Sequence, residues 1–258
     1  MIAAGIDVGA KNVKVVLLRD KNVISRSLRA IGLNTEEAIE EAFKKALSKN
    51  GVRREEVSTI TATGTGRKEV KFAGGELTEV GASAKGVHHL VSSVRTVMDV
   101  GAEEGRAIKV DENGRVVDFA INEKCAAGAG AFTEAMARAL EVDVEEIGKL
   151  SLKSRNAVPM NAQCAVFAES EVVSLIHAKT PKEDIARAVH DAIADRIVSM
   201  VRRVGLEKDI VVVGGLARNI GFIDSIKRTL ETDVLVPEYP EYAAALGAAL
   251  HAAETGGE

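Results

Sequence analysis

The chain has 258 residues, of which 46% are hydrophobic and 28% charged, so it can bury the core of one large or two medium domains. Its formal net charge of −4 gives no reason to expect nucleic acid or an anionic membrane as a partner. The start of the chain lacks the pattern of a signal peptide, and no run of about 18 apolar residues occurs, so we expect a cytoplasmic protein without membrane contact.

The first hundred residues alternate between apolar strands and polar turns. Asn34, followed by Glu36 and Glu37, is typical of a helix start, and Asn50-Gly51 is typical of a helix end. The strands are predicted at residues 2–10, 13–18, 23–28, 57–63 and 94–100.

An internal repeat relates two of these regions. The segments GIDVGAKNVKVVLLRDKNVISRSL and VMDVGAEEGRAIKVDENGRVVDFA align with Asp7 on Asp99 and Gly9 on Gly101, an offset of 99 − 7 = 92 residues. Each copy reads as a strand, an acidic glycine turn, a second strand, a polar turn and a third strand. The repeat predicts two similar domains that face each other.

The second half of the chain is mainly helical. Thr180-Pro181 predicts a helix start with Thr180 as the N-cap and Pro181 as the first helical residue, and this helix ends at Gly205. Further helices are predicted up to about residue 141 and at 143–150, 165–178, 220–230 and 241–253, with strands at 209–215 and 234–237. Both cysteines, Cys125 and Cys164, stand where a predicted helix begins.

The segment around Cys125 is the most unusual in the chain. Small residues follow the cysteine, including Gly128 and Gly130, and they would let a bulky cofactor approach the backbone. A thiolate is favoured at a helix start by the unpaired N–H groups and the helix dipole. The alternative is a buried structural cysteine on a tight turn. A reducing cytosol argues against a disulfide, which leaves metal or redox chemistry open.

The paired glycine turns favour a nucleotide site. A hairpin tip with a glycine offers backbone N–H groups to phosphate, and one carboxylate per domain, Asp7 and Asp99, suits Mg²⁺. Gly214-Gly215 after a buried strand would let adenine or ribose lie against the backbone. The chain lacks a P-loop or a Rossmann fingerprint in the required context.

Several motifs follow one another in a fixed order: DVGAKNVK, ATGTGR, MDVGAEEGRAIK, KCAAGAGAF, CAVFAESEV, VVVGGLARN and YAAALGAAL. They resemble the BadF/BadG/BcrA/BcrD ATPase family of the actin, hexokinase and heat-shock-chaperone superfamily. The resemblance spans nearly the whole chain and implies an α/β fold of two duplicated, ribonuclease H-like domains with a nucleotide cleft between them. The implied first domain comprises residues 1–96 and, in addition, a C-terminal helix at 240–255. The implied second domain comprises residues 97–239.

The resemblance also implies roles for individual residues. Cys125 and Cys164 would bind a 4Fe–4S cluster; because such a cluster takes four thiolates, two chains would share one cluster in a homodimer. Glu104, with Glu103 nearby, would act with Asp99 on the water that attacks ATP. The implied nucleotide contacts are Asp7, Gly9, Asn12 and Lys14 in the first phosphate loop, Asp99 and Gly101 in the second, and Gly214, Gly215 and Asn219 at the adenosine.

The implied function is ATP-driven electron transfer. A ferredoxin- or flavodoxin-like donor would reduce the cluster, and ATP turnover would pass the electron to a partner iron–sulfur enzyme. That partner could be a 2-hydroxyacyl-CoA dehydratase, an aryl-CoA reductase or a double-cubane-cluster protein. Two alternatives stay open: a small-molecule kinase, which would phosphorylate a hydroxyl without a cluster, and a non-catalytic actin-like scaffold, which would be colourless.

Overall fold

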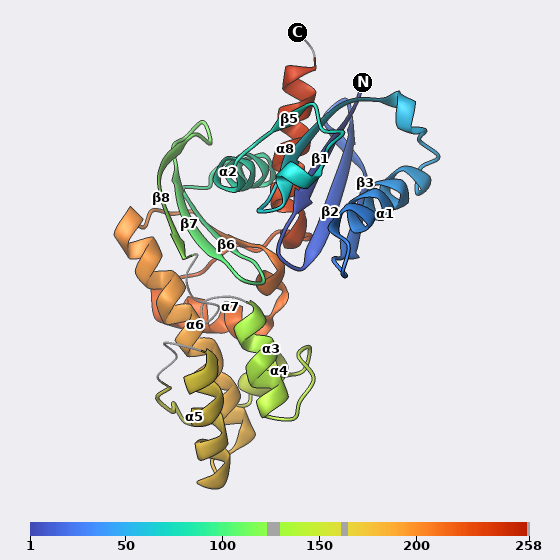
Figure 1. Ribbon diagram of the computed structural model, residues 1–258. Coiled ribbons are helices and arrows are strands. Elements are labelled where there is room, and N and C mark those ends of the chain that lie inside the picture. The colour runs from blue at the N-terminus through green and yellow to red at the C-terminus, as the bar shows by residue number, and fades with distance from the viewer. Residues whose placement is uncertain (123–129, 161–164, 257–258) are drawn as a thin grey trace. The chain divides into compact units, whose positions relative to one another are not determined.

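The computed structural model describes residues 1–122, 130–160 and 165–256. The chain forms two compact units, each built on its own β-sheet (Figure 1). The first unit comprises Met1–Val97, Val110–Val117 and Glu241–Glu258, and the second comprises Met98–Lys109 and Asp118–Pro240.

The first unit holds a five-stranded sheet in the order β3-β2-β1-β4-β5, where β1 runs antiparallel to β2 and parallel to β4. Its sheet is formed by β1 (Ile2–Val8), β2 (Asn12–Arg19), β3 (Asn22–Ala30), β4 (Val57–Thr63) and β5 (Gly75–Glu76). Its helices are α1 (Thr35–Ser48), α2 (Glu79–Leu90) and α8 (Ala243–Thr255).

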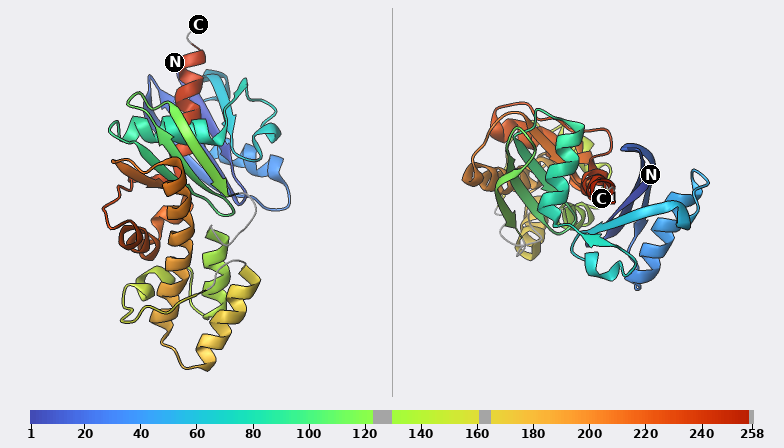
Figure 2. Two further views of the ribbon diagram at one scale, coloured as in Figure 1. Left: turned by 90° about the vertical axis from the view of Figure 1, so that its left-hand side faces the viewer. Right: turned by 90° about the horizontal axis from the view of Figure 1, so that it is seen from above.

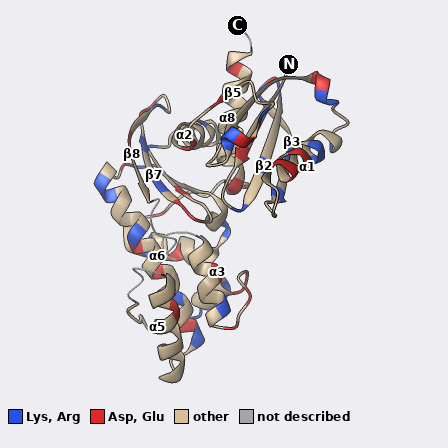
Figure 3. Cartoon of the chain, in the orientation of Figure 1, with Lys and Arg blue, Asp and Glu red and all other residues tan. Residues whose placement is uncertain are grey.

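The elements of the first unit follow from local sequence signals. Every residue of β1 is buried, as expected for a central strand with helices on both faces. Asn34 caps α1 by accepting a hydrogen bond from Glu37 N, and Phe43 on the apolar face of α1 is fully buried. The exposed face of α1 carries Glu36, Glu37, Glu40 and Glu41 in its first part and Lys44 and Lys45 towards its end (Figure 3), an order that complements the helix dipole.

Glycines let α8 approach both the sheet and α2 very closely. A Cβ on Gly5 of β1 would lie 2.0 Å from the Ala245 carbonyl oxygen, and a Cβ on Gly86 of α2 would lie 1.9 Å from that of Ala243. The contact at Gly247 of α8 is equally close, because a Cβ added there would lie 1.8 Å from the carbonyl oxygen of Ala82. Backbone therefore packs on backbone at these crossings.

The second unit holds the sheet β8-β7-β6-β9. Its strands are β6 (Thr96–Val100), β7 (Gly105–Val110), β8 (Val116–Asn122) and β9 (Ile210–Val213). The first two residues of β6, the last of β7 and the first two of β8 are counted with the first unit. Its helices are α3 (Gly130–Ala139), α4 (Ile147–Ser151), α5 (Ala165–His177), α6 (Lys182–Val204) and α7 (Ile220–Leu230). The long helix α6 lies at the centre of this helical layer, where α3, α4, α5 and α7 contact it (Figures 1 and 2).

The two sheets share one strand order, because β3-β2-β1-β4 in the first corresponds to β8-β7-β6-β9 in the second. The predicted α/β duplication is therefore confirmed at the level of topology.

Two local predictions are wrong. Helix α6 begins at Lys182 with Pro181 as its N-cap, not Thr180. The strand predicted at 234–237 is a single parallel bridge between Val211 and Leu235 within the described residues.

Candidate functional site

The first unit carries a carboxylate–ammonium pair at the end of its central strand. Asp7 lies near the end of β1 opposite Lys14 of β2, and Lys14 Nζ is 2.8 Å from Asp7 Oδ2. Asp7 is only 6% exposed, so the charge-assisted hydrogen bond compensates its desolvation. The turn that joins these strands is closed by a hydrogen bond from Gly9 N to the Asn12 carbonyl oxygen, 3.1 Å long.

A glycine from the neighbouring strand packs on this pair. Gly64, just after β4, has a φ of +93°, and a Cβ there would lie 2.3 Å from the Val8 carbonyl oxygen and 2.7 Å from Asp7 Oδ1. Thr63 Oγ1 beside it is buried and has no hydrogen-bond partner among the described residues. Gly64 belongs to the ATGTGR motif of the sequence but was not among the predicted site residues.

The second unit repeats this arrangement with an arginine in place of the lysine. Asp99 near the end of β6 is 7% exposed, and Arg106 Nη1 of β7 lies 3.7 Å from Asp99 Oδ2. Arg106 also forms an ion pair with Glu104, and Gly101 N donates to the Glu104 carbonyl oxygen at 2.9 Å. The predicted catalytic residue Glu104 is thus held beside Asp99 by one shared guanidinium group.

Gly214 is the counterpart of Gly64 in this unit. It follows β9 with a φ of +88°, and a Cβ there would lie 2.3 Å from the Val100 carbonyl oxygen and 2.8 Å from Asp99 Oδ1. The next residue, Gly215, has open space around it. The predicted contact residues Gly214 and Asp99 are therefore neighbours, 115 positions apart in sequence (214 − 99).

Asn219 is the N-cap of α7. Its Oδ1 accepts hydrogen bonds from Gly221 N at 3.0 Å and Phe222 N at 3.1 Å. Helix α4 leaves room for this amide, since a Cβ on Gly148 would lie 2.4 Å from Asn219 Oδ1. The capping contacts fix the side chain of Asn219 near the Gly214-Gly215 turn that precedes it in the chain.

A buried histidine of α6 lies beside Asn219. His190 is fully buried, and its Nδ1 is 2.8 Å from the Ala186 carbonyl oxygen, so the neutral ring carries its proton on Nδ1. Burial lowers the pKa of His190 to about 4, against the opposing effect of the bond to Ala186 O. The amide of Asn219 is beside the ring but outside hydrogen-bond geometry to Nε2.

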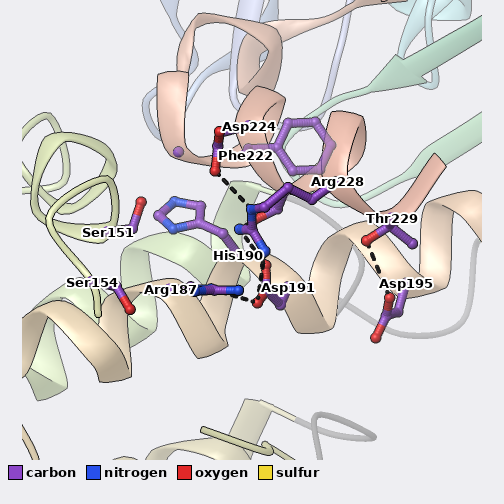
Figure 4. A network of polar contacts seen from close by, with 12 residues as sticks. Ser151, Ser154, Arg187, His190, Asp191, Asp195, Phe222, Asp224, Arg228 and Thr229 are labelled. Carbon is purple, nitrogen blue, oxygen red and sulfur yellow. Dashed lines mark hydrogen bonds and ion pairs between the residues drawn. The ribbon is translucent and has the colours of Figure 1, made fainter. Parts of the chain in front are cut away.

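An ion-pair network next to His190 joins α6 to α7 (Figure 4). Asp191 Oδ1 accepts from Ser225 Oγ at 2.6 Å and from Arg228 Nη2 at 2.7 Å, while Arg228 Nε donates to Asp224 Oδ2 at 2.9 Å. Burial raises the pKa of Asp191, but the bonds from Arg228 and Ser225 outweigh it and the net shift is downward. The network fixes α7 relative to α6.

A second anchor on α6 holds the loop that precedes Cys164 in sequence. Asp184, 3% exposed, accepts hydrogen bonds from Ser154 Oγ at 2.8 Å, Arg155 N at 3.0 Å and Asn156 N at 3.1 Å. These bonds lower the pKa of Asp184 to about 2, with the Ser154 hydroxyl as the largest cause.

Helix α3 begins directly on the phosphate turn predicted after β6. Gly130 N donates to the Gly101 carbonyl oxygen at 2.9 Å, and Ala131 N donates to that of Ala102 at 2.7 Å. Gly130, predicted as a cofactor contact, is thereby joined to the turn of Asp99. Three other predicted site residues, Cys125, Gly128 and Cys164, lie outside the described residues.

The predicted nucleotide residues thus fall into two groups. Asp7, Gly9, Asn12 and Lys14 belong to the first unit; Asp99, Gly101, Glu104, Gly130, Gly214, Gly215 and Asn219 belong to the second. Among the described residues no three His, Cys, Asp or Glu side chains converge on a metal position. One or two carboxylates are nevertheless the protein ligands with which Mg²⁺ binds when nucleotide phosphates supply further ligands. No helix in the described ranges is long and apolar enough to cross a membrane.

Comparison with known proteins shows what this chain is similar to. The sequence profile of the BadF/BadG/BcrA/BcrD ATPase family matches residues 4–252. The activator of lactoyl-CoA dehydratase from Anaerotignum propionicum is 38% identical over 98% of this chain and 98% of its own length.

Solved structures agree with this similarity. The activator of 2-hydroxyisocaproyl-CoA dehydratase from Clostridium difficile, with bound ADPNP, superposes with a TM-score of 0.95 at 36% identity over 100% of this chain and 96% of its own. A ROK family glucokinase from Streptomyces griseus has a TM-score of 0.62 at 13% identity over 98% and 100% of the two chains, a likeness of fold alone.

Proposed function

This chain belongs to the BadF/BadG/BcrA/BcrD ATPase family and has the actin-like ATPase fold, and on that premise we propose that it is an ATP-dependent electron-transfer activator. Its partner would be an iron–sulfur enzyme of the 2-hydroxyacyl-CoA dehydratase or aryl-CoA reductase class. The relatives named as dehydratase activators support the partner class, and the ADPNP in one related structure supports the nucleotide.

The nucleotide would be held by the two carboxylate–cation pairs. Lys14 and Arg106 would supply positive charge to the phosphates, while Asp7 and Asp99 would hold Mg²⁺, which neutralises phosphate charge when bound. Glu104 would orient the attacking water once the phosphate draws Arg106 away from it. Asn219 and the Gly214-Gly215 turn would receive the adenosine.

The cysteines would hold the redox centre. Cys125 and Cys164 supply two thiolates per chain, and a 4Fe–4S cluster takes four, so a homodimer would share one cluster. Thiolate sulfur is the ligand that such a cluster requires, and these are the chain's two cysteines. When bound, the cluster would store one low-potential electron from a ferredoxin- or flavodoxin-like donor.

The single observation that carries the coupling is the hydrogen bond from Gly130 N to Gly101 O. It joins the proposed phosphate turn to the first residue of α3, which lies five positions after Cys125 (130 − 125). A change in the turn on ATP binding or hydrolysis would therefore move the start of α3 directly. Nucleotide can drive such a change only through unequal affinity for the two conformations.

The proposal is tested on protein purified without oxygen. We expect about four irons per dimer, ATP hydrolysis, and ATP-dependent activation of a purified dehydratase. Cys125→Ser and Cys164→Ser should each lose iron and activation, whereas the matched control Ser170→Ala on the exposed face of α5 should keep both. If the purified protein hydrolyses ATP but contains no iron, the electron-transfer role is contradicted and only the ATPase activity remains.

A further inference from the structure

A hollow of about 550 Å³ lies within the first unit and contains none of the residues assigned to the nucleotide or the cluster. It is bordered by α2, by α8 and by the turns that join β2 to β3 and β7 to β8; Figure 1 labels these helices and strands. Its volume lies within the usual range for small-molecule pockets. Its most prominent lining side chains are Lys21, Lys85, His88, His89, Arg115 and His251.

The walls of the hollow are fixed by specific contacts. Asp111 Oδ1 accepts hydrogen bonds from Asn113 N at 2.9 Å and Arg115 N at 2.8 Å, which shapes the β7–β8 turn. Gly114, with a φ of +74°, packs on the ring of His88, and His88 Nε2 is 3.2 Å from the Glu112 carbonyl oxygen. The turn that carries Arg115 is thereby held against α2.

The charge of the lining is unbalanced. Lys21, Lys85 and Arg115 give three permanent positive charges, and Glu254 is the one acidic side chain in the lining. Glu254 is bonded to Lys85 at 2.6 Å. The side chains of Lys21, His89 and His251 form no hydrogen bond or ion pair with the described residues. This excess stands in a chain whose formal net charge is −4.

Basic side chains gathered around one concavity repel one another, and an anion between them would relieve that repulsion. Lysine, arginine and histidinium side chains are the donors that bind phosphate oxygens. The hollow also has apolar walls, supplied by Leu77, Val116 and Leu250.

We propose that this hollow binds a small phosphate-bearing anion, such as a pyrophosphate with an apolar substituent, at a site separate from the nucleotide. Arg115, Lys21 and the histidines would bind the phosphate oxygens, while the apolar walls would cover the rest of the ligand. The free ligand could be inorganic pyrophosphate or an organic pyrophosphate, and the two differ only in their use of those walls.

The histidines provide the direct test, because the chain has five and three of them line the hollow. We expect titration with inorganic pyrophosphate, followed by NMR of the imidazole rings, to shift the signals of His88, His89 and His251. His177, exposed on α5, is the control and should stay unchanged. His190 lies beside Asn219, so a shift of His190 alone would mean binding at the proposed nucleotide residues and would overturn the inference.

Affinity provides the second test. We expect Lys21→Gln/Arg115→Gln/His251→Gln to lower pyrophosphate affinity at least about tenfold, measured by calorimetry. Lys44→Gln/Lys68→Gln/Lys208→Gln removes three exposed basic residues outside the hollow and should leave the affinity unchanged. Equal losses in both triple variants would mean diffuse attraction to the surface and would contradict the proposal. ATP hydrolysis should persist in both variants.

A third measurement separates the two ligand sources. An alkyl pyrophosphate should bind more tightly than inorganic pyrophosphate if the ligand is organic, and Leu77→Ala should remove that difference. Equal affinity would assign the site to the inorganic anion. Both ligands should raise the unfolding temperature of the wild type but not of the Lys21/Arg115/His251 variant. A rise of equal size in that variant would refute binding in the hollow.

Discussion

At the scale of the residue, the proposed nucleotide site depends on two glycines that no other residue can replace. Gly64 and Gly214 both have positive φ and both lie against the carbonyl oxygen of a central strand and against its aspartate. A side chain there would displace the carboxylate as well as strain the backbone. The same geometry occurs once in each unit.

The first prediction uses two adjacent glycines. Gly214→Ala should destabilise the protein by about 2 kcal/mol or more, because it combines a positive φ with a Cβ 2.3 Å from Val100 O. Gly215→Ala is the control, since nothing lies within 4 Å of its Cβ. Urea unfolding measures both, and equal stability of the two variants would show that the close approach is not maintained in solution.

The second prediction concerns His190. Its pKa is about 4 in the folded state and near 6.5 in the unfolded chain, so the unfolded state binds more protons between these values. Stability should therefore fall as the pH drops from 6.5 to 4, by an amount on the order of 3 kcal/mol. His190→Phe should flatten this slope, and His177→Gln should keep it.

We propose that nucleotide binding brings the Asn219 amide within hydrogen-bond reach of His190 Nε2, which would give His190 a readout besides stability. Glutamine places an oxygen near the position of Nε2, so His190→Gln should keep the KM for ATP, and His190→Phe should raise it with little change in kcat. If both variants have the wild-type KM, His190 acts only as part of the core.

At the scale of the element, α2 and α8 form the closest packing in the first unit. Gly86 and Gly247 let the backbones of these two helices touch, and Gly5 lets α8 pack equally closely on β1 of the sheet. In the second unit the ion pair between Asp191 and Arg228 joins α6 to α7, and Asp184 of α6 holds the loop at Ser154.

The third prediction tests the helix crossing. Gly86→Ala should destabilise by about 3 kcal/mol or more, since a Cβ 1.9 Å from Ala243 O forces the helices apart. Gly81→Ala lies in the same helix near flexible side chains and should be close to neutral, because alanine favours a helix over glycine. Thermal unfolding compares the two. A neutral Gly86→Ala variant would contradict the close crossing.

The fourth prediction concerns the loop held by Asp184. The pKa of this carboxyl is about 2 when folded and near 3.9 when unfolded, so its stabilising effect is present above pH 4 and is lost as the pH falls towards 2. Asp184→Asn should therefore be less stable than the wild type at pH 7, and the difference should shrink below pH 4. The exposed Asp143→Asn variant is the control, and a pH-independent difference for Asp184→Asn would contradict this role.

At the scale of the whole molecule, each unit carries one buried carboxylate paired with one cation, and our proposal assigns both pairs to the nucleotide. The fifth prediction is that Asp7→Asn and Asp99→Asn each lower kcat for ATP at least about 100-fold, as expected for loss of electrostatic stabilisation in the transition state. Asp99→Asn should keep its iron, which separates hydrolysis from cluster binding. If either variant hydrolyses ATP with the wild-type kcat, the aspartate that it replaces does not take part in hydrolysis.

The sequence by itself determined the features that depend on neighbours along the chain. Most of the strands, the helix start at Asn34, the two acidic glycine turns and the duplication could be predicted because pattern, capping and turn chemistry are local. The repeat predicted two similar domains, and the order of the motifs implied the family and, through it, the fold class.

Only the tertiary structure decided which distant residues meet. The contacts of Gly64 with Asp7, of Gly214 with Asp99 and of Gly86 with Ala243 join segments that are far apart in sequence, as does the burial of His190 against Asn219. No periodicity along the chain encodes such contacts, because they depend on how closely two backbones pack after each has formed.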